Sequence, residues 1–182
     1  MIDYYKALKM KNILVAGKPK AGKTTLITKV IDNLRDKSIG GFYTQEIRKG
    51  GERKGFRIRT LDGKEGILAH KVTKSKYKVG SYGVNIEDLE GIGVVSIEVA
   101  LKERDIVVID EIGKMELYSK KFEEAVIRTL NSPKRVLATI PEHRNRFLNE
   151  IRRRNDVELV EITPNNRDLV VEDIVQRLCS SH

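Results

Sequence analysis

Residues 17–25 read GKPKAGKTT, and no other segment limits the possible folds of this chain so strongly. The apolar run KNILVA (11–16) precedes it, and KTTLITKVIDNLRDK (23–37), with apolar residues at helical spacing, follows it. A strand, a glycine-containing loop and a helix in this order form the unit that surrounds a polyphosphate. The motif G-x-x-x-x-G-K-[ST] of that unit is matched by Gly17, Gly22, Lys23 and Thr24.

Each motif residue has a physical task in such a loop. Gly17 and Gly22 admit backbone conformations that a Cβ atom would forbid. The loop N–H groups and the helix N-terminus attract anions, Lys23 reaches the β- and γ-phosphates, and the Thr24 hydroxyl binds Mg²⁺. An ordinary glycine turn is the alternative, and the flanking strand and helix disfavour it. The predicted nucleotide contacts are Gly17, Lys18, Pro19, Lys20, Ala21, Gly22, Lys23, Thr24 and Thr25.

The rest of the chain predicts an α/β fold with a mostly parallel sheet and helices on both faces, because apolar runs alternate with amphipathic segments. Further core strands are predicted at 105–110, 135–140 and 157–162. Helices are predicted at 23–37, 95–104, 119–131, 143–154 and 167–179. Ser119 is the expected cap of the third helix, and Asn165 or Asn166 the expected cap of the last.

Residues 42–70 have a different pattern. Apolar and polar residues alternate there around KGGERKG and LDGKEG, which predicts antiparallel β-hairpins inserted at one edge of the sheet. Just before them, IGG (39–41) is predicted as the loop that closes the first helical unit. The basic, glycine-punctuated stretch 71–93 indicates no definite element.

The length of 182 residues fits one domain, expected over 10–182, with 1–9 as a flexible N-terminal extension and Met10 as an alternative start. No apolar run approaches the ~20 residues of a membrane helix, so no membrane partner is expected. The N-terminus lacks the apolar core of a secretory signal. The single cysteine, Cys179, cannot form an internal disulfide, which suits a reducing cytoplasm.

The net charge of +9 attracts anions, which include both nucleotides and nucleic acids. The basic segments 71–78 and 143–155 are more typical of solvated surfaces than of nucleic-acid-binding faces, so a nucleic-acid partner stays open but is not favoured. The histidines are isolated from the cysteine and from one another, which disfavours a zinc site. The oligomeric state is left open, with a monomer favoured.

The pair Asp110-Glu111 ends the apolar run IVVI. Two carboxylates at the end of a buried strand are costly without a nearby cation, and the carboxyl ends of parallel strands gather around a phosphate site. We predict that Asp110 holds Mg²⁺ through water and that Glu111 polarises the attacking water, with Lys23 as the other catalytic residue. A solvated acidic strand end is the alternative, and the phosphate loop earlier in the chain disfavours it.

Three basic residues are further candidates. Lys114, which follows Glu111 closely, can stabilise charge that develops on the phosphoryl oxygens, although a solvated loop lysine explains it equally well. Arg48 or Arg53 can act as an arginine finger, with a solvated basic hairpin as the favoured alternative. Glu116 is close enough in sequence to enter the same site.

With GKPKAGKTT, GGFYTQEIRKGGERKGFRIRTL, VGSYGVN and VVIDEIGKMEL in hand, the chain from about residue 10 to its end resembles a known family. It is similar to the small nucleoside-triphosphatases first described from thermophiles, which include the human cancer-related nucleoside-triphosphatase. The resemblance implies a RecA-like P-loop fold and Mg²⁺-dependent hydrolysis of several nucleoside triphosphates. It places further nucleotide contacts at Asp110, Glu111, Ile112 and Gly113.

The resemblance also includes TPNNRD (163–168), where Asn166 and Arg167 are candidate contacts to the base. It raises the expectation for Arg48 and Arg53 without assigning them a role.

The sequence therefore predicts a Mg²⁺-dependent phosphatase of nucleoside triphosphates, which cleaves ATP, GTP, CTP and UTP with low base specificity to the diphosphate and phosphate. The main rival is a nucleotide or metabolite kinase. Such kinases usually carry a helical acceptor-binding insert and an arginine-rich lid, whereas residues 42–70 predict β-hairpins. A nucleic-acid-associated NTPase switch is the second rival, and the positive charge keeps it open.

Overall fold

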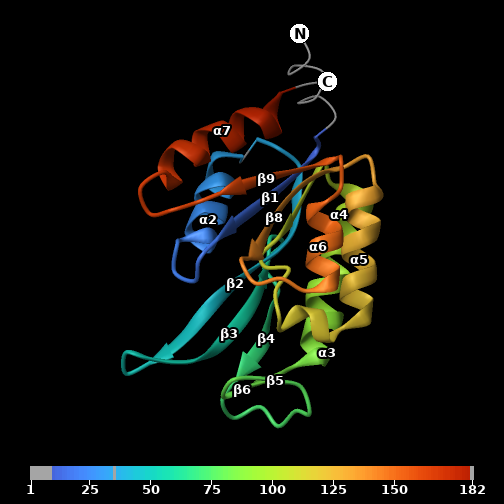
Figure 1. Ribbon diagram of the computed structural model, residues 1–182. Helices are drawn as coiled ribbons and strands as arrows, with labels where there is room; N and C mark the ends of the chain where they lie inside the picture. Colours follow the sequence, from blue (N-terminus) through green and yellow to red (C-terminus); the bar gives the residue numbers. More distant parts are fainter. Residues whose placement is uncertain (1–9, 35, 181–182) are drawn as a thin grey trace.

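Nine strands form one mixed β-sheet in the computed structural model of the protein, which describes residues 10–34 and 36–180 (Figure 1). Their order across the sheet is β5-β6-β4-β3-β2-β7-β8-β1-β9. The strands are β1 (Asn12–Gly17), β2 (Ile39–Lys49), β3 (Glu52–Thr60), β4 (Glu65–His70), β5 (Lys78–Val79), β6 (Tyr82–Val84), β7 (Ile106–Ile109), β8 (Arg135–Pro141) and β9 (Val157–Glu161). The predicted extension over residues 1–9 lies outside the described residues.

Helices cover both faces of this sheet. They are α2 (Lys23–Asn33), α3 (Ile86–Asp88), η1 (Leu89–Val94), α4 (Val95–Glu103), η2 (Glu116–Tyr118), α5 (Lys120–Asn131), α6 (Arg146–Arg152) and α7 (Arg167–Cys179). Helices α2 and α7 pack on one face, and α4, α5 and α6 pack on the other (Figure 1). The α/β prediction is confirmed. No helix in the described part of the chain is both long enough and apolar enough to cross a membrane.

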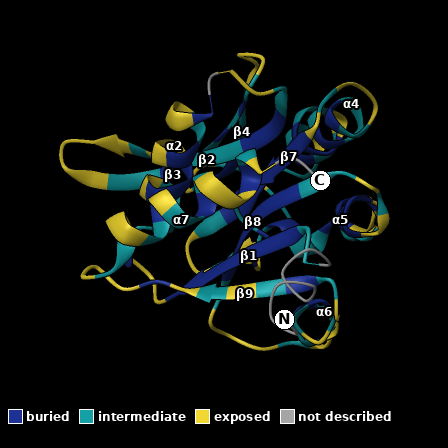
Figure 2. Cartoon of the chain, turned by 90° about the horizontal axis from the view of Figure 1, so that it is seen from above, coloured by how far each residue is buried: buried dark blue, intermediate teal, exposed yellow. Residues whose placement is uncertain are grey.

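The parallel half of the sheet contains β2, β7, β8, β1 and β9. Every residue of β1 is buried, because alternate side chains enter two separate hydrophobic clusters. Leu14 and Ala16 belong to the cluster that includes residues of α4, α5 and α6, whereas Ile13 and Val15 belong to the cluster that includes residues of α2 and α7. Figure 2 shows this burial along the central strands, with exposed residues on the outer sides of the helices. A strand buried on both faces explains the continuous apolar run in the sequence.

The antiparallel half continues the sheet from β2 to one edge, as predicted. Residues 39–42 of β2 pair in parallel with β7, and the rest of β2 pairs with β3 in a hairpin that projects from the body of the molecule (Figure 1). Gly50 and Gly51 connect the two strands with φ angles of 58° and 78°. Two consecutive left-handed residues match the twist of a two-residue hairpin turn.

The prediction of a loop at residues 39–41 is wrong, because Ile39 begins β2. Glycine pairs often mark turns, but these two allow close packing. A Cβ on Gly40 would lie 2.8 Å from the Cβ of Ala100 on α4, and a Cβ on Gly41 would lie 2.0 Å from the carbonyl oxygen of Val108 on β7. Glycine inside a strand can therefore signal a close neighbour instead of a turn.

Two helix boundaries also differ from the prediction. Helix α2 stops at Asn33, not at residue 37, because its buried face ends at Leu34, whose carbonyl then accepts a turn bond from the Lys37 N–H group. Helix α6 begins at residue 146, not 143, because the Asn145 side chain caps it by accepting the Leu148 N–H group at 2.7 Å. The predicted Ser119 cap of α5 is confirmed, since its hydroxyl accepts the Phe122 N–H group.

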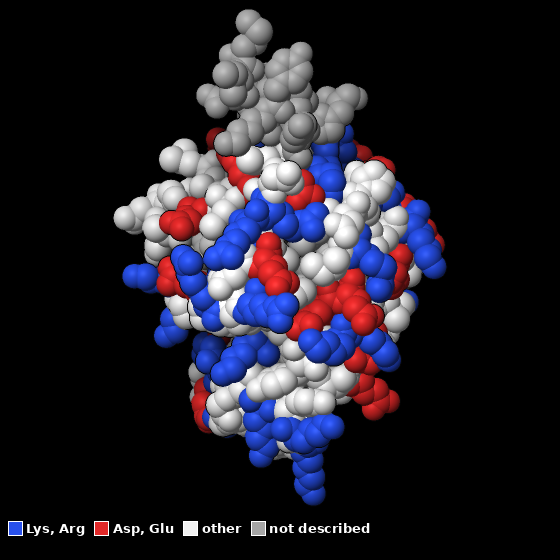
Figure 3. All heavy atoms as spheres, turned by 45° about the vertical axis from the view of Figure 1, so that its right-hand side comes forward, with Lys and Arg blue, Asp and Glu red and all other residues white. Residues whose placement is uncertain are grey.

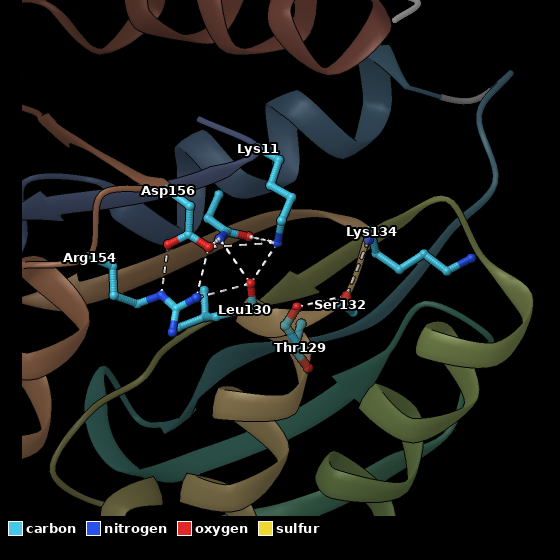
Figure 4. Close-up of polar contacts among 8 residues, drawn as sticks. Lys11, Thr129, Leu130, Ser132, Lys134, Arg154 and Asp156 are labelled. Atoms are coloured by element: carbon cyan, nitrogen blue, oxygen red, sulfur yellow. Dashed lines mark hydrogen bonds and ion pairs between the residues drawn. The ribbon is translucent and has the colours of Figure 1, made fainter. Parts of the chain in front are cut away.

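A polar network ties the C-terminus of α5 to the start of β1 and β9 (Figure 4). The Leu130 carbonyl, in the last turn of α5, accepts hydrogen bonds from Lys11, at 2.6 Å, from Asn12, at 3.2 Å, and from Arg154, at 3.4 Å. Arg154 also forms two bonds to the Asp156 carboxylate. Cationic and amide donors at a helix C-terminus satisfy carbonyls that have no partner within the helix. This network fixes the end of the sheet that carries the N-termini of β1 and β9.

Candidate active site

The carboxyl ends of β1, β8 and β7 meet at one edge of the sheet and bring the predicted site together. The glycine loop follows β1, and Asp110 follows β7. Strand β8 lies between β1 and β7, so Asp110 does not come from the strand next to the loop. Thr139, on β8, fills the gap between them. The edge formed by the carboxyl ends is where α/β sheets bind ligands.

The two motif glycines are required by the shape of the loop. A Cβ on Gly17 would lie 2.9 Å from the Ile162 carbonyl oxygen, so this position has no room for a side chain. Gly22 has a φ of 93° and starts α2, where its carbonyl accepts the Leu26 N–H group. Lys20, at a φ of 68°, is the non-glycine residue of the loop in the left-handed region. The loop therefore curls back on itself and ends with the N-terminus of α2.

Lys23 points back across this loop. Its Nζ donates to the Gly17 carbonyl oxygen at 3.0 Å and lies 3.4 Å from Glu111 Oε2. The ammonium group is largely buried, with its side chain 11% exposed, against 30% for Glu111. The Glu111 carboxylate is thus the counter-charge of Lys23. A bound phosphate would be expected to compete with it for the same ammonium group.

Asp110 is the buried centre of the site. Its side chain accepts the Thr24 hydroxyl at 2.9 Å on one oxygen and the Thr139 hydroxyl at 2.5 Å on the other. Burial raises the pKa of this carboxyl group, and the two hydroxyl donors and the backbone N–H of Thr44 act against that rise. The first turn of α2, strand β8 and strand β2 thus all hold Asp110 in one orientation.

Two further carboxyl groups lie beside Asp110. Burial raises the pKa of Glu111; the negative charge of Asp110 adds to this, and Lys23 opposes it. Burial, then the charge of Glu111, raise the pKa of Glu116 well above its usual value. Glu116 accepts the Gly113 N–H group at 3.1 Å. A Cβ on Gly113 would lie 2.5 Å from one oxygen of Glu111 and 2.9 Å from one of Glu116, so only glycine leaves both carboxyl groups in place.

A cleft of about 680 Å³ opens over these residues. It runs from the glycine loop to the antiparallel half of the sheet. Its lining residues are Pro19, Lys20, Gly22, Lys23, Thr24, Thr25, Thr44, Gln45, Glu46, Arg53, Phe56, Leu68, Val79, Asp110, Glu111, Lys114, Met115, Glu116, Pro141 and His143.

Comparison with known proteins agrees with this geometry. A family model described as NTPase matches residues 12–175. This chain belongs to that NTPase family. It is 49% identical, over 91% of its length and 94% of the relative, to the nucleoside-triphosphatase THEP1 of Thermotoga sp. (strain RQ2). It is 43% identical to the nucleoside-triphosphatase THEP1 of Aquifex aeolicus, over 91% of this chain and 98% of the relative.

Two solved structures share the fold of this NTPase-family chain. The crystal structure of THEP1 from Aquifex aeolicus superimposes with a TM-score of 0.84 at 42% identity, over 93% of this chain and 99% of the other. The solution structure of a human cancer-related nucleoside triphosphatase gives a TM-score of 0.80 at 36% identity, over 94% of this chain and 98% of the other. The P-loop α/β fold and the family resemblance predicted from the sequence are therefore confirmed.

The NTPase-family fold separates the predicted site residues into two groups. Those that line the cleft are Pro19, Lys20, Gly22, Lys23, Thr24, Thr25, Arg53, Asp110, Glu111 and Lys114. Those that do not line it are Gly17, Lys18, Ala21, Arg48, Ile112, Gly113, Asn166 and Arg167. Ile112 is fully buried and donates its N–H group to the Thr139 carbonyl. Arg48 is bound to Glu46 and to the Gly51 carbonyl at the hairpin turn.

The loop after β9 lies against the glycine loop on another side. The Asn166 side chain closes its own loop, because it accepts the Thr163 N–H group and donates to the Glu161 carbonyl. The Arg167 guanidinium packs on Gly22, where an added Cβ would lie 2.6 Å from it. The Nε atom of Arg167 is buried and has no hydrogen-bond partner among the residues described.

Sequence reasoning missed Thr139 and Thr44, and it considered Glu116, like Glu46, as a replacement for Glu111 in the role of base. Thr139 had a detectable signal, since it is the polar residue inside the apolar run RVLATI. Thr44 had none, because only the path of β2 past Asp110 brings it to the cleft: the Asp110 N–H group donates to the Phe42 carbonyl at 3.2 Å.

Proposed function

We propose that this protein hydrolyses nucleoside triphosphates to the diphosphate and phosphate, with Mg²⁺ and with little preference for the base. The observation that carries the proposal is the arrangement at the cleft floor, where Thr24 is bonded to the buried Asp110 and Lys23 is paired with Glu111. The names of the relatives, nucleoside-triphosphatase THEP1, support the same reaction class.

The oxygen atoms at the cleft floor fit Mg²⁺. Thr24 Oγ1 and Asp110 Oδ2 lie 2.9 Å apart, and a hydroxyl and a carboxylate are hard oxygen ligands of the kind that Mg²⁺ prefers. Among the described residues, no three His, Cys, Asp or Glu side chains gather as a metal site, so substrate oxygens and water would complete the coordination. The bound ion would neutralise charge on the β- and γ-phosphates.

Lys23 and Glu111 perform the proposed hydrolysis together. When the β- and γ-phosphates take the Lys23 ammonium group, Glu111 loses its counter-charge and becomes available as a base. Its carboxylate then accepts a proton from water as the new bond between that water oxygen and the γ-phosphorus forms. The bond between the γ-phosphorus and the β–γ bridging oxygen breaks, and the diphosphate leaves. Lys114, exposed at the cleft, is a candidate for contacting the transferred group.

Low base specificity follows from which groups are contacted. The glycine loop, Lys23 and Thr24 address phosphates and metal, which all nucleoside triphosphates share. Arg167, packed on Gly22, is our candidate wall for the base, because a planar guanidinium can stack on any base. Asn166 would act through the loop that it closes.

The protein is proposed to act as one domain over residues 10–182, in the cytoplasm and as a monomer. Figure 3 shows one face of the molecule, on which Lys and Arg side chains are intermixed with Asp and Glu. The net charge of +9 is not spread as a continuous basic surface on that face, so that face gives no support to a nucleic-acid partner, which we do not favour.

The test is phosphate release from ATP, GTP, CTP and UTP with Mg²⁺ and no other acceptor. We expect phosphate from all four, at values of kcat/KM within about a hundredfold, which corresponds to less than ~3 kcal/mol of base discrimination. The controls are reactions without Mg²⁺ and with the Lys23→Ala variant. Absence of phosphate release, or equal release by Lys23→Ala, would overturn the proposal.

A further inference from the structure

The cleft continues beyond the residues to which hydrolysis is assigned. Strand β2 starts its exposed course beside Asp110, where the Phe42 carbonyl accepts the Asp110 N–H group, and it runs outward to Glu46. Four residues of strand span about 13 Å. The cleft of about 680 Å³ includes the glycine loop at one end, and its lining continues past Asp110 and Glu111 to residues of the antiparallel half of the sheet. Much of the cleft therefore lies beyond the carboxylates, along the antiparallel half of the sheet.

The far part of the cleft has an apolar wall. Phe56 on β3, Leu68 on β4, Val79 on β5 and Met115 after β7 all line it. A triphosphate is charged along its whole length and gains nothing from such a wall. The wall therefore fits a ligand with an apolar body instead of a longer phosphate chain.

A fixed cation stands beside this wall. The Arg53 guanidinium lies 5.1 Å from the centre of the Phe56 ring and 5.7 Å from that of Tyr82. Arg53 donates to the Tyr82 hydroxyl at 3.1 Å and to Glu46 Oε1 at 2.8 Å. With these contacts Arg53 is oriented before any ligand binds, and Glu46 beside it offers acceptor atoms for a hydroxyl group.

The direction of the phosphate chain decides which ligand this is. In the proposed function the loop and the N-terminus of α2 would hold the β-phosphate, and Glu111, paired with Lys23, would lie on the γ side. The nucleoside would then extend away from Glu111, toward Arg167, which packs on Gly22. The far part of the cleft is lined by Phe56, Leu68 and Val79 and not by Arg167, so a nucleophile bound there would approach the γ-phosphorus from the side opposite the nucleoside.

We propose that the far part of the cleft binds an organic alcohol with an apolar body, which accepts the γ-phosphoryl group in place of water. The inference rests on the proposed function and adds a second acceptor to it. The alcohol oxygen forms the new bond to the γ-phosphorus, its proton passes to Glu111, and the bond to the β–γ bridging oxygen breaks. The products are a phosphate monoester and the nucleoside diphosphate. The β-rich insert, which argued against a kinase in the sequence, here builds the acceptor wall.

The test measures how the full chain divides the γ-phosphoryl group of ATP between water and a series of alcohols from methanol to n-butanol. Inorganic phosphate and alkyl phosphate are counted in the same sample by ³¹P NMR. If an apolar wall receives the alkyl chain, the alkyl phosphate formed per mole of alcohol rises about fourfold for each added methylene, the factor expected for burying one CH₂ group. A flat series, or no alkyl phosphate beside normal inorganic phosphate, overturns the inference alone. Absence of both products overturns the proposed function.

Two matched variants locate the effect. Val79→Thr keeps the side-chain shape and puts a hydroxyl into the wall, and we expect it to lower the butanol-to-methanol preference at least threefold. Val72→Thr is the control, because Val72 is 80% exposed and does not line the cleft, and the preference should stay unchanged. Phe56→Ala, checked for folding by thermal denaturation, should remove more of the preference. If these wall variants change the ratio of ATP to CTP turnover and leave the alcohol preference intact, the wall holds the base and the inference is wrong.

Discussion

Replacing Thr139 by Val isolates one bond at the centre of the site. The Thr139 hydroxyl, fully buried, donates to Asp110 at 2.5 Å, and Asp110 itself is 1% exposed. Valine keeps the shape and leaves one buried carboxylate oxygen without this donor. A hydrogen bond to a charged group contributes ~1.5–3 kcal/mol to the free energy of unfolding. At about 2 kcal/mol, a chain of this length should lose roughly 4–8 °C in Tm.

The assay is urea denaturation of both proteins, together with the Mg²⁺ concentration that gives half-maximal hydrolysis. That concentration should rise in Thr139→Val, because the Thr24 hydroxyl then orients Asp110 without the second hydroxyl donor. Thr129→Val is the matched control: Thr129 is also fully buried, but its hydroxyl donates to the neutral Ala125 carbonyl within α5. For this control we expect the free energy of unfolding to fall by less than ~1 kcal/mol. Equal losses in the two variants would refute the reasoning that Asp110 makes the bond at Thr139 special.

Three other predictions concern catalysis and pH. Glu111→Gln should lower kcat by about 10²- to 10⁴-fold with KM nearly constant, measured by phosphate release beside titration with a non-hydrolysable analogue; a rate within threefold of the parent would move the base elsewhere. Lys23→Ala should abolish turnover and weaken binding of the same analogue, because the cation for the β- and γ-phosphates is gone; near-normal turnover would contradict the nucleotide site. The hydrogen bonds from Arg154 are the largest cause that holds the pKa of Asp156 below its ordinary value, so the stability from this pair is fully present above the unfolded-state pKa of about 4 and is lost as pH falls through the lower folded-state pKa. The difference between the denaturation midpoints of the parent and Arg154→Ala should be largest at pH 7 and should shrink as the pH is lowered to 3.

The sequence determined the features that depend on neighbouring residues. The order of strand, glycine loop and helix was readable because the motif spacing and the two periodicities are local. The Gly50-Gly51 turn and the Ser119 cap were readable for the same reason, since each acts within a few residues. The role of Asp110 could be predicted because two acidic residues end an apolar run, although its hydrogen-bond partners could not be predicted.

Only the tertiary structure decided which distant residues share the cleft. Arg48 and Arg53 are equivalent in the sequence and are cross-strand partners in the hairpin, yet Arg53 lines the cleft beside Phe56 and Tyr82, whereas Arg48 is bonded to the Gly51 carbonyl at the turn. The sequence around Gly41 is typical of a loop, and only the close packing of β7 against this residue explains why a glycine lies within a strand. Thr139 meets Asp110 because β8 runs between β1 and β7, and pairing order between strands is not encoded in the spacing of either segment. Such contacts join residues far apart in the chain, so their geometry exists only once the sheet has formed.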